Sequence, residues 1–236
     1  MNWRTLIAFF VKHIFSIPKT IWFNFHYLPF KQACLFPIFC YNVRLRKAQG
    51  TIQILTDEIK TGMIALGPDI VGLYPDAGVI WENAGQIIFR GKTRIGNSCA
   101  ICVGRNGVLD LGNNFVTNAA TKIVCAYRIK IAENALLGWE TLLMDTAFHR
   151  IKGMDGKLKG KGYAEIELGR DNWLGAKCML LPGAKTPDYC VMGAGSFLNK
   201  DISHFPSHIM VAGNPVEIKV KDVWRDLYDD APEITF

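Results

Sequence analysis

The chain has 236 residues, of which 50% are hydrophobic and 20% are charged. This composition excludes an intrinsically disordered protein and suffices for one large domain, with or without an appendage. The net charge of +6 favours anionic partners such as phosphorylated cofactors, acidic glycans or a membrane surface, but it is too small and too dispersed to indicate nucleic acid.

The N-terminal segment, residues 1–45, is rich in apolar and aromatic residues. Its first part places apolar side chains at helical spacing, namely Trp3, Leu6, Ile7, Phe10, Val11 and Ile14. The aromatic stretch "IPKTIWFNFHYLPF" follows. We expect no signal peptide, because no small-residue cleavage site follows the first apolar run, and no uncharged run approaches the roughly 20 residues that span a bilayer. Residues 1–30 therefore predict either an interfacial helix on a membrane or a helix that packs against the main domain or a sister subunit.

The seven cysteines are odd in number and scattered along the chain. Cys99 and Cys102 form a C-x-x-C pair, but no second pair and no nearby histidine complete a metal site. This usage predicts reduced thiols in a cytosolic protein, without a disulfide framework or a bound metal.

Large residues return at every sixth position in the second half of the chain. From residue 168 onward this series is Leu168, Leu174, Leu180, Thr186, Met192 and Leu198. Small residues often follow, as at Gly169 and Gly193, and upstream the same spacing links Ile131, Leu137 and Leu143. A period of six fits neither an amphipathic helix nor a two-sided strand. It predicts a solenoid of short parallel strands about 4.8 Å apart, with the large residues pointing inward and the small ones at the corners.

The period stops after Leu143 and resumes at Leu168, with His149 falling six residues after the last regular position. The intervening stretch, "RIKGMDGKLKGKGYAEI" at residues 150–166, is basic, and its Asp155-Gly156 pair is typical of a hairpin turn. We therefore expect a loop that leaves the solenoid, with His149 at its root.

Over about residues 64–219 the repeat resembles that of the hexapeptide-repeat acyltransferases. The stretches "NWLGAKCMLLPG" (172–183) and "GAGSFLNKDISHFPSHIMVAGNPVEIKV" (193–220) are similar to the end of the solenoid in acetyl-CoA-dependent sugar O-acetyltransferases, and "MDTAFH" (144–149) resembles their aspartate-x-x-phenylalanine-histidine segment. The resemblance implies an all-β core, a left-handed parallel β-helix of hexapeptide repeats at residues 46–219, followed by a C-terminal tail at 220–236. Thr186-Pro187, in "AKTPDY", departs from the repeat, so we expect a distorted corner there.

The resemblance also implies the site residues. It makes His149 the general base, a role that suits imidazole because its pKa lies near neutrality. Asp145 would orient the histidine or contact the sugar. Coenzyme A would lie in a groove between subunits of a homotrimer, with backbone groups of Ala176 and Ala194 along its pantetheine arm and Lys200 near a phosphate. The full set that matches cofactor positions is Trp173, Gly175, Ala176, Ala194, Asn199, Lys200 and Lys219. Without the resemblance, His149 would be interpreted as a buried structural histidine, and the glycines as corner residues.

The leading hypothesis is therefore a cytoplasmic, acetyl-CoA-dependent O-acetyltransferase that modifies a sugar hydroxyl during capsule, exopolysaccharide or lipopolysaccharide synthesis, on a lipid-linked acceptor that residues 1–30 would help to reach. One alternative is an N-acyl or succinyl transferase on an amino sugar, and another is a non-catalytic β-helical scaffold. A zinc hydrolyase on the same scaffold would need three histidines, and the repeat region offers His149 without a histidine partner at coil spacing.

Overall fold

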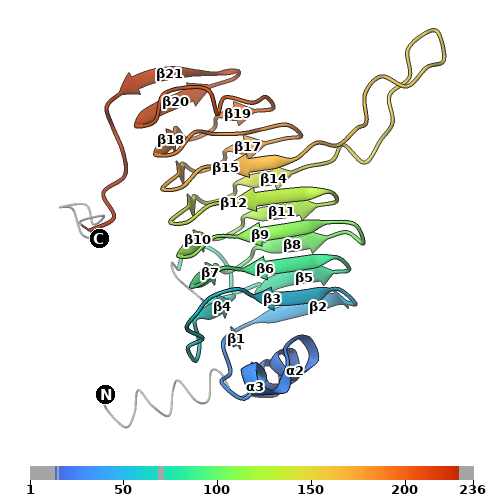
Figure 1. Ribbon diagram of the computed structural model, residues 1–236, viewed down its shortest axis with the longest axis vertical. Helices are drawn as coiled ribbons and strands as arrows, with labels where there is room; N and C mark the ends of the chain where they lie inside the picture. Colours follow the sequence, from blue (N-terminus) through green and yellow to red (C-terminus); the bar gives the residue numbers. More distant parts are fainter. Residues whose placement is uncertain (1–13, 15, 69–71, 229–236) are drawn as a thin grey trace.

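A computed structural model of the chain describes residue 14 and residues 16–68 and 72–228. Figure 1 shows a tall stack of coils, with two helices at its N-terminal end and a long arm that projects from its upper half. The helices are Ser16–Tyr27 (α2) and Phe30–Ala33 (α3). The amphipathic helix predicted from Trp3 to Ile14 lies outside the described residues, apart from Ile14, which is exposed.

The strands of the described chain form three sheets, called here faces A, B and C. Face A contains β1 (Ile38–Cys40), β4 (Ile64–Leu66), β7 (Thr93–Ile95), β10 (Phe115–Thr117), β13 (Leu136–Leu137), β16 (Trp173–Leu174), β18 (Cys190–Met192), β20 (Ile209–Gly213) and β21 (Val216–Lys221). Face B contains β2 (Val43–Ala48), β5 (Val79–Asn83), β8 (Ala100–Val103), β11 (Lys122–Cys125), β14 (Leu142–Met144), β17 (Met179–Leu180) and β19 (Phe197–Leu198). Face C contains β3 (Thr51–Ile54), β6 (Gln86–Phe89), β9 (Val108–Leu111), β12 (Arg128–Ile131) and β15 (Ile166–Leu168).

The order of the strands shows how the chain winds. Each turn of the chain visits face A, then B, then C, and the next turn pairs one level higher. All pairings between coils are parallel, and only β21 runs antiparallel to its neighbour, β20. The strand order confirms the solenoid that the repeat predicts, and the fold is the left-handed parallel β-helix that the family resemblance implies.

The six-residue period corresponds to the inward-facing ladders of this β-helix. Leu168, Leu174 and Leu180 lie on faces C, A and B in turn, and all three are almost completely buried. Each is in register with its counterpart in the coil below, as Leu174 is with Leu137. Because every inward position needs an apolar side chain and three faces make one coil, the spacing of six follows directly from the stacking.

The helix α2 covers the N-terminal end of this core. Phe23 is fully buried and packs edge-on against Trp81, with ring centroids 5.2 Å apart. The side chain of Asn24 accepts a hydrogen bond from Ile38 N at 3.2 Å and donates one to Ile38 O at 2.7 Å. It therefore pairs with both backbone polar groups of Ile38 in β1, the first strand of face A. This part of the N-terminal segment packs against the main domain, which was one of its two predicted placements.

The predicted departure at Thr186 is accommodated by hydrogen bonds. Face C narrows here to isolated bridges at Lys185, and Thr186 takes the inward position with only 4% of its surface exposed. Its hydroxyl accepts a hydrogen bond from Gly169 N at 3.2 Å and donates one to Asn172 Oδ1 at 2.6 Å. A polar side chain thus occupies an inward position that is apolar in other coils, and its hydroxyl group is fully hydrogen-bonded.

Three boundaries differ from those predicted. The β-helix begins with β1, ahead of residue 46, because Ile38 already pairs with Ile64. The projecting arm spans residues 145–165 in place of 150–166, because Ile166 is a buried residue of β15. The strand β21 crosses the expected start of the tail at residue 220, because it is paired along its whole length with β20.

Candidate active site

The arm leaves the β-helix where face B meets face C. Thr146 pairs with Tyr163 and Lys152 with Leu158 in isolated antiparallel bridges, and Ala147 N donates a hydrogen bond to Gly162 O at 2.7 Å. The arm is therefore a narrow two-stranded ribbon, and it projects far from the coils in Figure 1. Its neck is the pairing of residues 146 and 163.

His149 lies just beyond this neck and is exposed. Its backbone carbonyl lies against Gly162, where an added Cβ would approach the oxygen to 2.9 Å. Within the described chain no hydrogen bond or ion pair engages the imidazole. The position is the predicted root of the loop, and the exposure argues against the alternative of a buried structural histidine.

Asp145 is completely buried and bonded to the backbone. Its carboxylate accepts hydrogen bonds from Ala126 N at 2.7 Å, Tyr127 N at 2.8 Å and Arg128 N at 2.7 Å. These amides form the corner between faces B and C in the coil below. The carboxylate thus holds the corner from which the arm departs, a role that the sequence did not suggest.

Further contacts fix the neck of the arm to that corner. The rings of Tyr127 and Tyr163 lie 5.1 Å apart, and Arg128 Nε lies 3.3 Å from the Glu165 carboxylate. Ala164 N donates to Asp145 O at 3.0 Å. The base of the arm is therefore held from both of its strands, so that the position of His149 is set by the β-helix.

The predicted pantetheine positions lie at a different edge, where face A meets face B. Ala176 and Ala194 occupy the same place in successive coils, and Gly195 N donates to Ala176 O at 2.8 Å. Ala194 is exposed and Ala176 half-buried. A Cβ added at Gly175 would lie 2.7 Å from Ala194 N, so the glycine is required for the close approach of the coils. Trp173 precedes this edge on the outer side of face A, with 40% of its surface exposed.

The predicted phosphate contacts lie near the C-terminal end of the stack. Asn199 and Lys200 are exposed at the edge between faces B and C. Lys219 is exposed on β21 and its ammonium lies 3.0 Å from Glu217. The hydrogen bond from Lys219 lowers the pKa of Glu217, and the charge of Lys200 adds to this effect. The structure thus distributes the predicted site residues over two edges and the outer side of face A.

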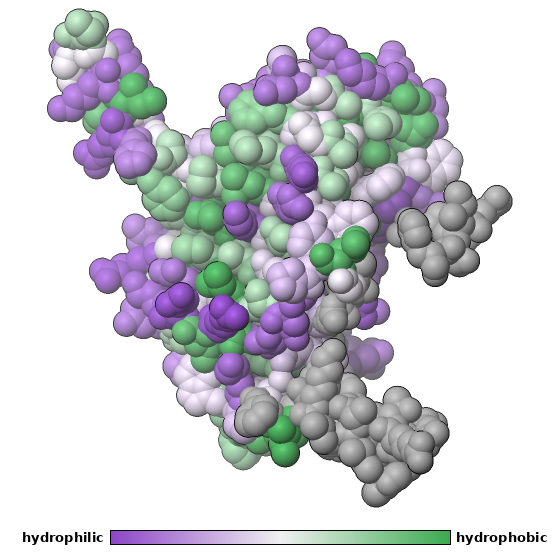
Figure 2. Space-filling model, turned by 180° about the vertical axis from the view of Figure 1, so that it is seen from behind, coloured by the Kyte–Doolittle hydropathy of each residue, from purple (hydrophilic) through white to green (hydrophobic). Residues whose placement is uncertain are grey.

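The outer surfaces of the three faces differ in chemistry. Face C carries a ladder of alternating charge, formed by Asp110, Lys130, Glu167, Lys185 and Asp201. Lys130 Nζ lies 2.7 Å from Glu167, and its hydrogen bond lowers the pKa of that carboxyl group. The outer side of face B is mainly apolar, apart from residues such as Lys122, and includes Ile80, Leu142, Met144, Met179 and Phe197. Figure 2 shows apolar side chains gathered along the long axis on the side that it presents.

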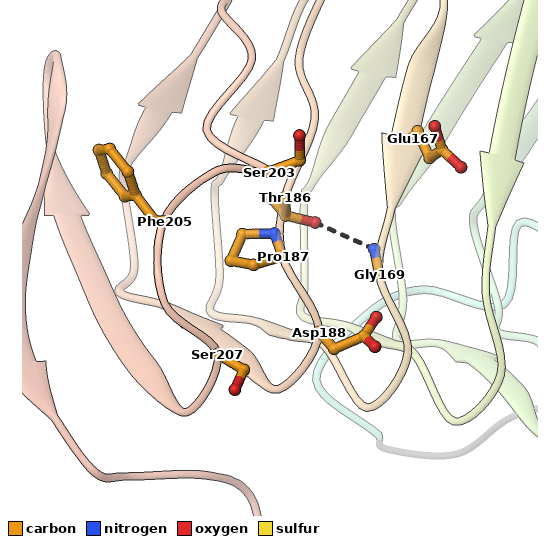
Figure 3. A pocket seen from close by; sticks show the side chains of 8 residues that line it. All are labelled: Glu167, Gly169, Thr186, Pro187, Asp188, Ser203, Phe205 and Ser207. Atoms are coloured by element: carbon orange, nitrogen blue, oxygen red, sulfur yellow. Dashed lines mark hydrogen bonds between the residues drawn. The ribbon is translucent and has the colours of Figure 1, made fainter.

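A hollow of about 460 Å³ lies at the third edge, between faces C and A. Figure 3 shows its lining, in which Thr186 bonds to Gly169 and the carboxylates of Glu167 and Asp188 point to one side. Asp188 pairs with Arg170 at 3.2 Å, and Ser203 donates to Asp201 at 2.6 Å. None of the predicted site residues lines this hollow.

No group of three His, Cys, Asp or Glu side chains in residues 14, 16–68 and 72–228 could hold a metal ion. Neither α2 nor α3 has the length and apolar character needed to cross a bilayer.

The chain is similar in sequence to known acetyltransferases. A galactoside O-acetyltransferase of Escherichia coli is 31% identical over 111 residues, covering 47% of this chain and 52% of that protein. The resemblance to the hexapeptide-repeat acyltransferases is confirmed. A galactoside O-acetyltransferase of Lactococcus lactis is 29% identical to this hexapeptide-repeat chain over 126 residues, covering 52% of the chain and 58% of the relative.

The extent of this similarity is limited. The chain spans about half the length of the curated relatives that it matches. No family model matches the chain. Among solved structures, the polysialic acid-specific acetyltransferase NeuO aligns with a TM-score of 0.49 and 15% identity, covering 81% of this chain and 92% of its own.

Proposed function

We propose that the protein is an acetyl-CoA-dependent O-acetyltransferase that modifies a sugar hydroxyl in the synthesis of a surface polysaccharide, such as a capsule, exopolysaccharide or lipopolysaccharide. The observation that carries the proposal is the 31% identity to a galactoside O-acetyltransferase over nearly half of the chain. The exposed His149, on a rigid neck beside the coils, supports it.

His149 would act as the general base. The imidazole takes the proton of the acceptor hydroxyl while the oxygen attacks the thioester carbonyl of acetyl-CoA. The carbon–sulfur bond then breaks, an ester forms, and the sulfur of coenzyme A receives the proton from the imidazolium. Asp145 would be a positioning residue in this scheme, because its buried carboxylate serves the corner that supports the neck.

Coenzyme A would extend along the edge between faces A and B. The backbone at Gly175, Ala176 and Ala194 would contact the pantetheine arm, with Trp173 beside it. Asn199 and Lys200 lie at the edge between faces B and C, so they would reach the nucleotide from the neighbouring subunit, across the groove between the two chains. Lys219 would also lie toward the nucleotide, where lysine meets phosphate as a point charge. Lys200 is the stronger candidate because Lys219 already pairs with Glu217 at 3.0 Å.

The active form would be a homotrimer. His149 lies at the edge between faces B and C, whereas Ala176 and Ala194 lie at the edge between faces A and B. A second copy of the chain could bring one edge to the other, and the apolar outer side of face B would be buried by such an arrangement. The charged ladder of face C would remain in water.

The experiment is a transfer assay with acetyl-CoA and a panel of sugar acceptors, with succinyl-CoA and amino sugars included for the alternative reaction. His149→Ala should lower turnover roughly 10²–10⁴-fold and leave coenzyme A affinity unchanged in calorimetry, because only proton transfer loses its catalyst. His204→Ala, at an exposed histidine of the C-terminal loop, is the matched control and should keep full activity. Wild-type turnover in His149→Ala would refute the role of the base, and a failure of the wild type to bind coenzyme A would favour the scaffold.

We further propose that the N-terminal segment contacts the cytoplasmic face of a membrane that presents a lipid-linked acceptor. The helix α2 exposes Ile17, Ile21, Trp22 and Phe25 on the side away from the core, each between 42% and 44%. An apolar outer side that includes a tryptophan suits the headgroup boundary. Trp22→Ser with Phe25→Ser should then reduce sedimentation with anionic liposomes, whereas Leu158→Ser on the arm should not. If the wild-type protein does not sediment with the liposomes, the membrane proposal is wrong, and the role of the segment is to pack within the protein.

A further inference from the structure

One large side chain interrupts the edge between faces A and B. The equivalent position in successive coils is occupied, from the N-terminal end, by Asn97, Ala119, Trp139, Ala176, Ala194 and Gly213. A ladder of backbone hydrogen bonds ties them together, for example from Lys177 N to Trp139 O at 2.7 Å and from Glu140 N to Ala119 O at 3.1 Å. Trp139 is therefore one coil below Ala176 in a column of small residues.

The edge below Trp139 is covered by Tyr74 and Pro75, which precede β5. Tyr74 donates a hydrogen bond to Glu140 at 2.7 Å. Lower down, Asn97 and Ser98 donate to Pro75 O at 3.0 Å and 2.8 Å. Above Trp139 the edge is open, since Ala176 is only half-buried and Ala194 is exposed. Trp139 thus marks the closed end of the open stretch.

The indole of Trp139 also has an unused donor. Its Nε1 atom is buried and has no hydrogen-bond partner in the described structure. Buried polar groups in proteins are almost always paired, so an exception requires a reason. Trp139 as a whole is only half-buried, so other atoms of the residue are exposed at this edge, where a ligand in the open stretch would meet them.

Trp139 lies at the same level along the stack of coils as His149, the proposed general base. Trp139 follows β13 and His149 follows β14, so both belong to one coil. In a cyclic assembly about an axis parallel to the stack, every subunit keeps the same height. His149 of the partner subunit would then lie at the level of Trp139. With the phosphates near Lys200 of the partner subunit, the arm of the cofactor would descend past Ala194 and Ala176, so the thioester would reach this same level.

We propose that Trp139 determines which acyl group the enzyme accepts. The indole closes the cofactor groove at the level of the thioester, so an acetyl group fits and a longer acyl chain meets the ring. This inference rests on the proposed function and names the donor specificity of that same site. A specificity pocket discriminates against each extra methylene by roughly 10–200-fold, so a single large residue can set the choice.

The experiment compares transfer from acetyl-CoA and butyryl-CoA to the same acceptor by the full-length protein. Trp139→Ala should reduce the preference for acetyl-CoA by about tenfold or more, because the space of the indole becomes available to the longer chain. Trp139→Phe keeps most of the bulk and should keep most of the preference. Trp173→Ala, at the exposed tryptophan one coil above on face A, should weaken both donors alike.

An unchanged ratio of kcat/KM for the two donors in Trp139→Ala would overturn the inference, as would a loss of preference in Trp139→Phe. If Trp139→Ala fails to fold, Trp139→Leu offers a smaller change and should shift the ratio in the same direction. A wild type that binds coenzyme A but transfers no acyl group would overturn the proposed function itself, and the inference would fall with it. Transfer with an unaltered ratio would leave the function standing and refute only Trp139.

Discussion

The carboxylate of Asp145 illustrates what one residue contributes to the arm. It accepts hydrogen bonds from three backbone amides that precede it by 17–19 residues. The sequence places Asp145 close to His149, and a link between the two was the natural prediction. The amide partners could not be predicted, because they belong to the previous coil and are brought near only by stacking. The position of His149 at the root of a loop, by contrast, followed from the break in the period.

Asp145→Ala should therefore destabilise the protein. Hydrogen bonds to a charged group contribute about 1.5–3 kcal/mol each, and the substitution leaves three amides without their acceptor. We expect the free energy of unfolding to fall by about 3 kcal/mol or more in urea titrations. Asp145→Asn retains one acceptor oxygen, so its free energy of unfolding should lie between those of Asp145→Ala and the wild type. His149→Ala is the control that should unfold like the wild type, and equal stability of Asp145→Ala and wild type would contradict the structural role.

At the scale of the strands, the six-residue period predicted which side chains point inward, because the stacking of apolar side chains between coils itself produces that period. Leu143, Leu180 and Leu198 follow one another on face B in register. The outer surfaces were not predicted, since no period distinguishes them. The alternating charges of Lys130, Glu167 and Lys185 on face C come from separate coils and become neighbours only in the folded chain. The residues of the column that contains Trp139 also come from separate coils. The stretch "LLGWET" does not show that Trp139 stacks below Ala176, because this depends on the register between strands.

The ladder position of Thr186 gives a test at this scale. Thr186→Val restores the apolar residue that the repeat calls for and conserves volume, yet it should lower the free energy of unfolding by about 1–3 kcal/mol. The reason is that Gly169 N and Asn172 Oδ1 both lose a buried partner. Thr186→Ser keeps the hydroxyl and separates this effect from packing. A double-mutant cycle with Asn172→Ala should show coupling between the two side chains, and a more stable Thr186→Val would disprove the account.

For the whole molecule, the stacking of the coils could be predicted from the sequence, whereas the relation between the edges of the β-helix could not. The parallel stacking was within reach of the sequence, because the repeat is a local pattern. The helical spacing was recognised from Trp3 to Ile14, whereas the helix that covers the core is α2, in the aromatic stretch that follows. The relation between edges was not within reach, because it depends on how three faces close into one coil. That relation now separates His149 from Ala176 and Ala194 within a single chain. If these residues have the proposed roles, catalysis would need a neighbouring copy, as the proposed homotrimer would provide.

Mixed oligomers test this implication directly. One variant carries His149→Ala, which removes the base, and the other carries Ala194→Trp, which fills the cofactor edge at an exposed position. Each should be inactive alone and trimeric in light scattering. If a site takes His149 from one chain and the groove from the next, random exchange of equal amounts leaves roughly one quarter of sites with both intact parts. If the site lies within one chain, every site keeps one defect. Recovery of about that fraction of wild-type activity after subunit exchange would support the shared site, whereas no recovery despite demonstrated exchange, or an active monomer, would refute it.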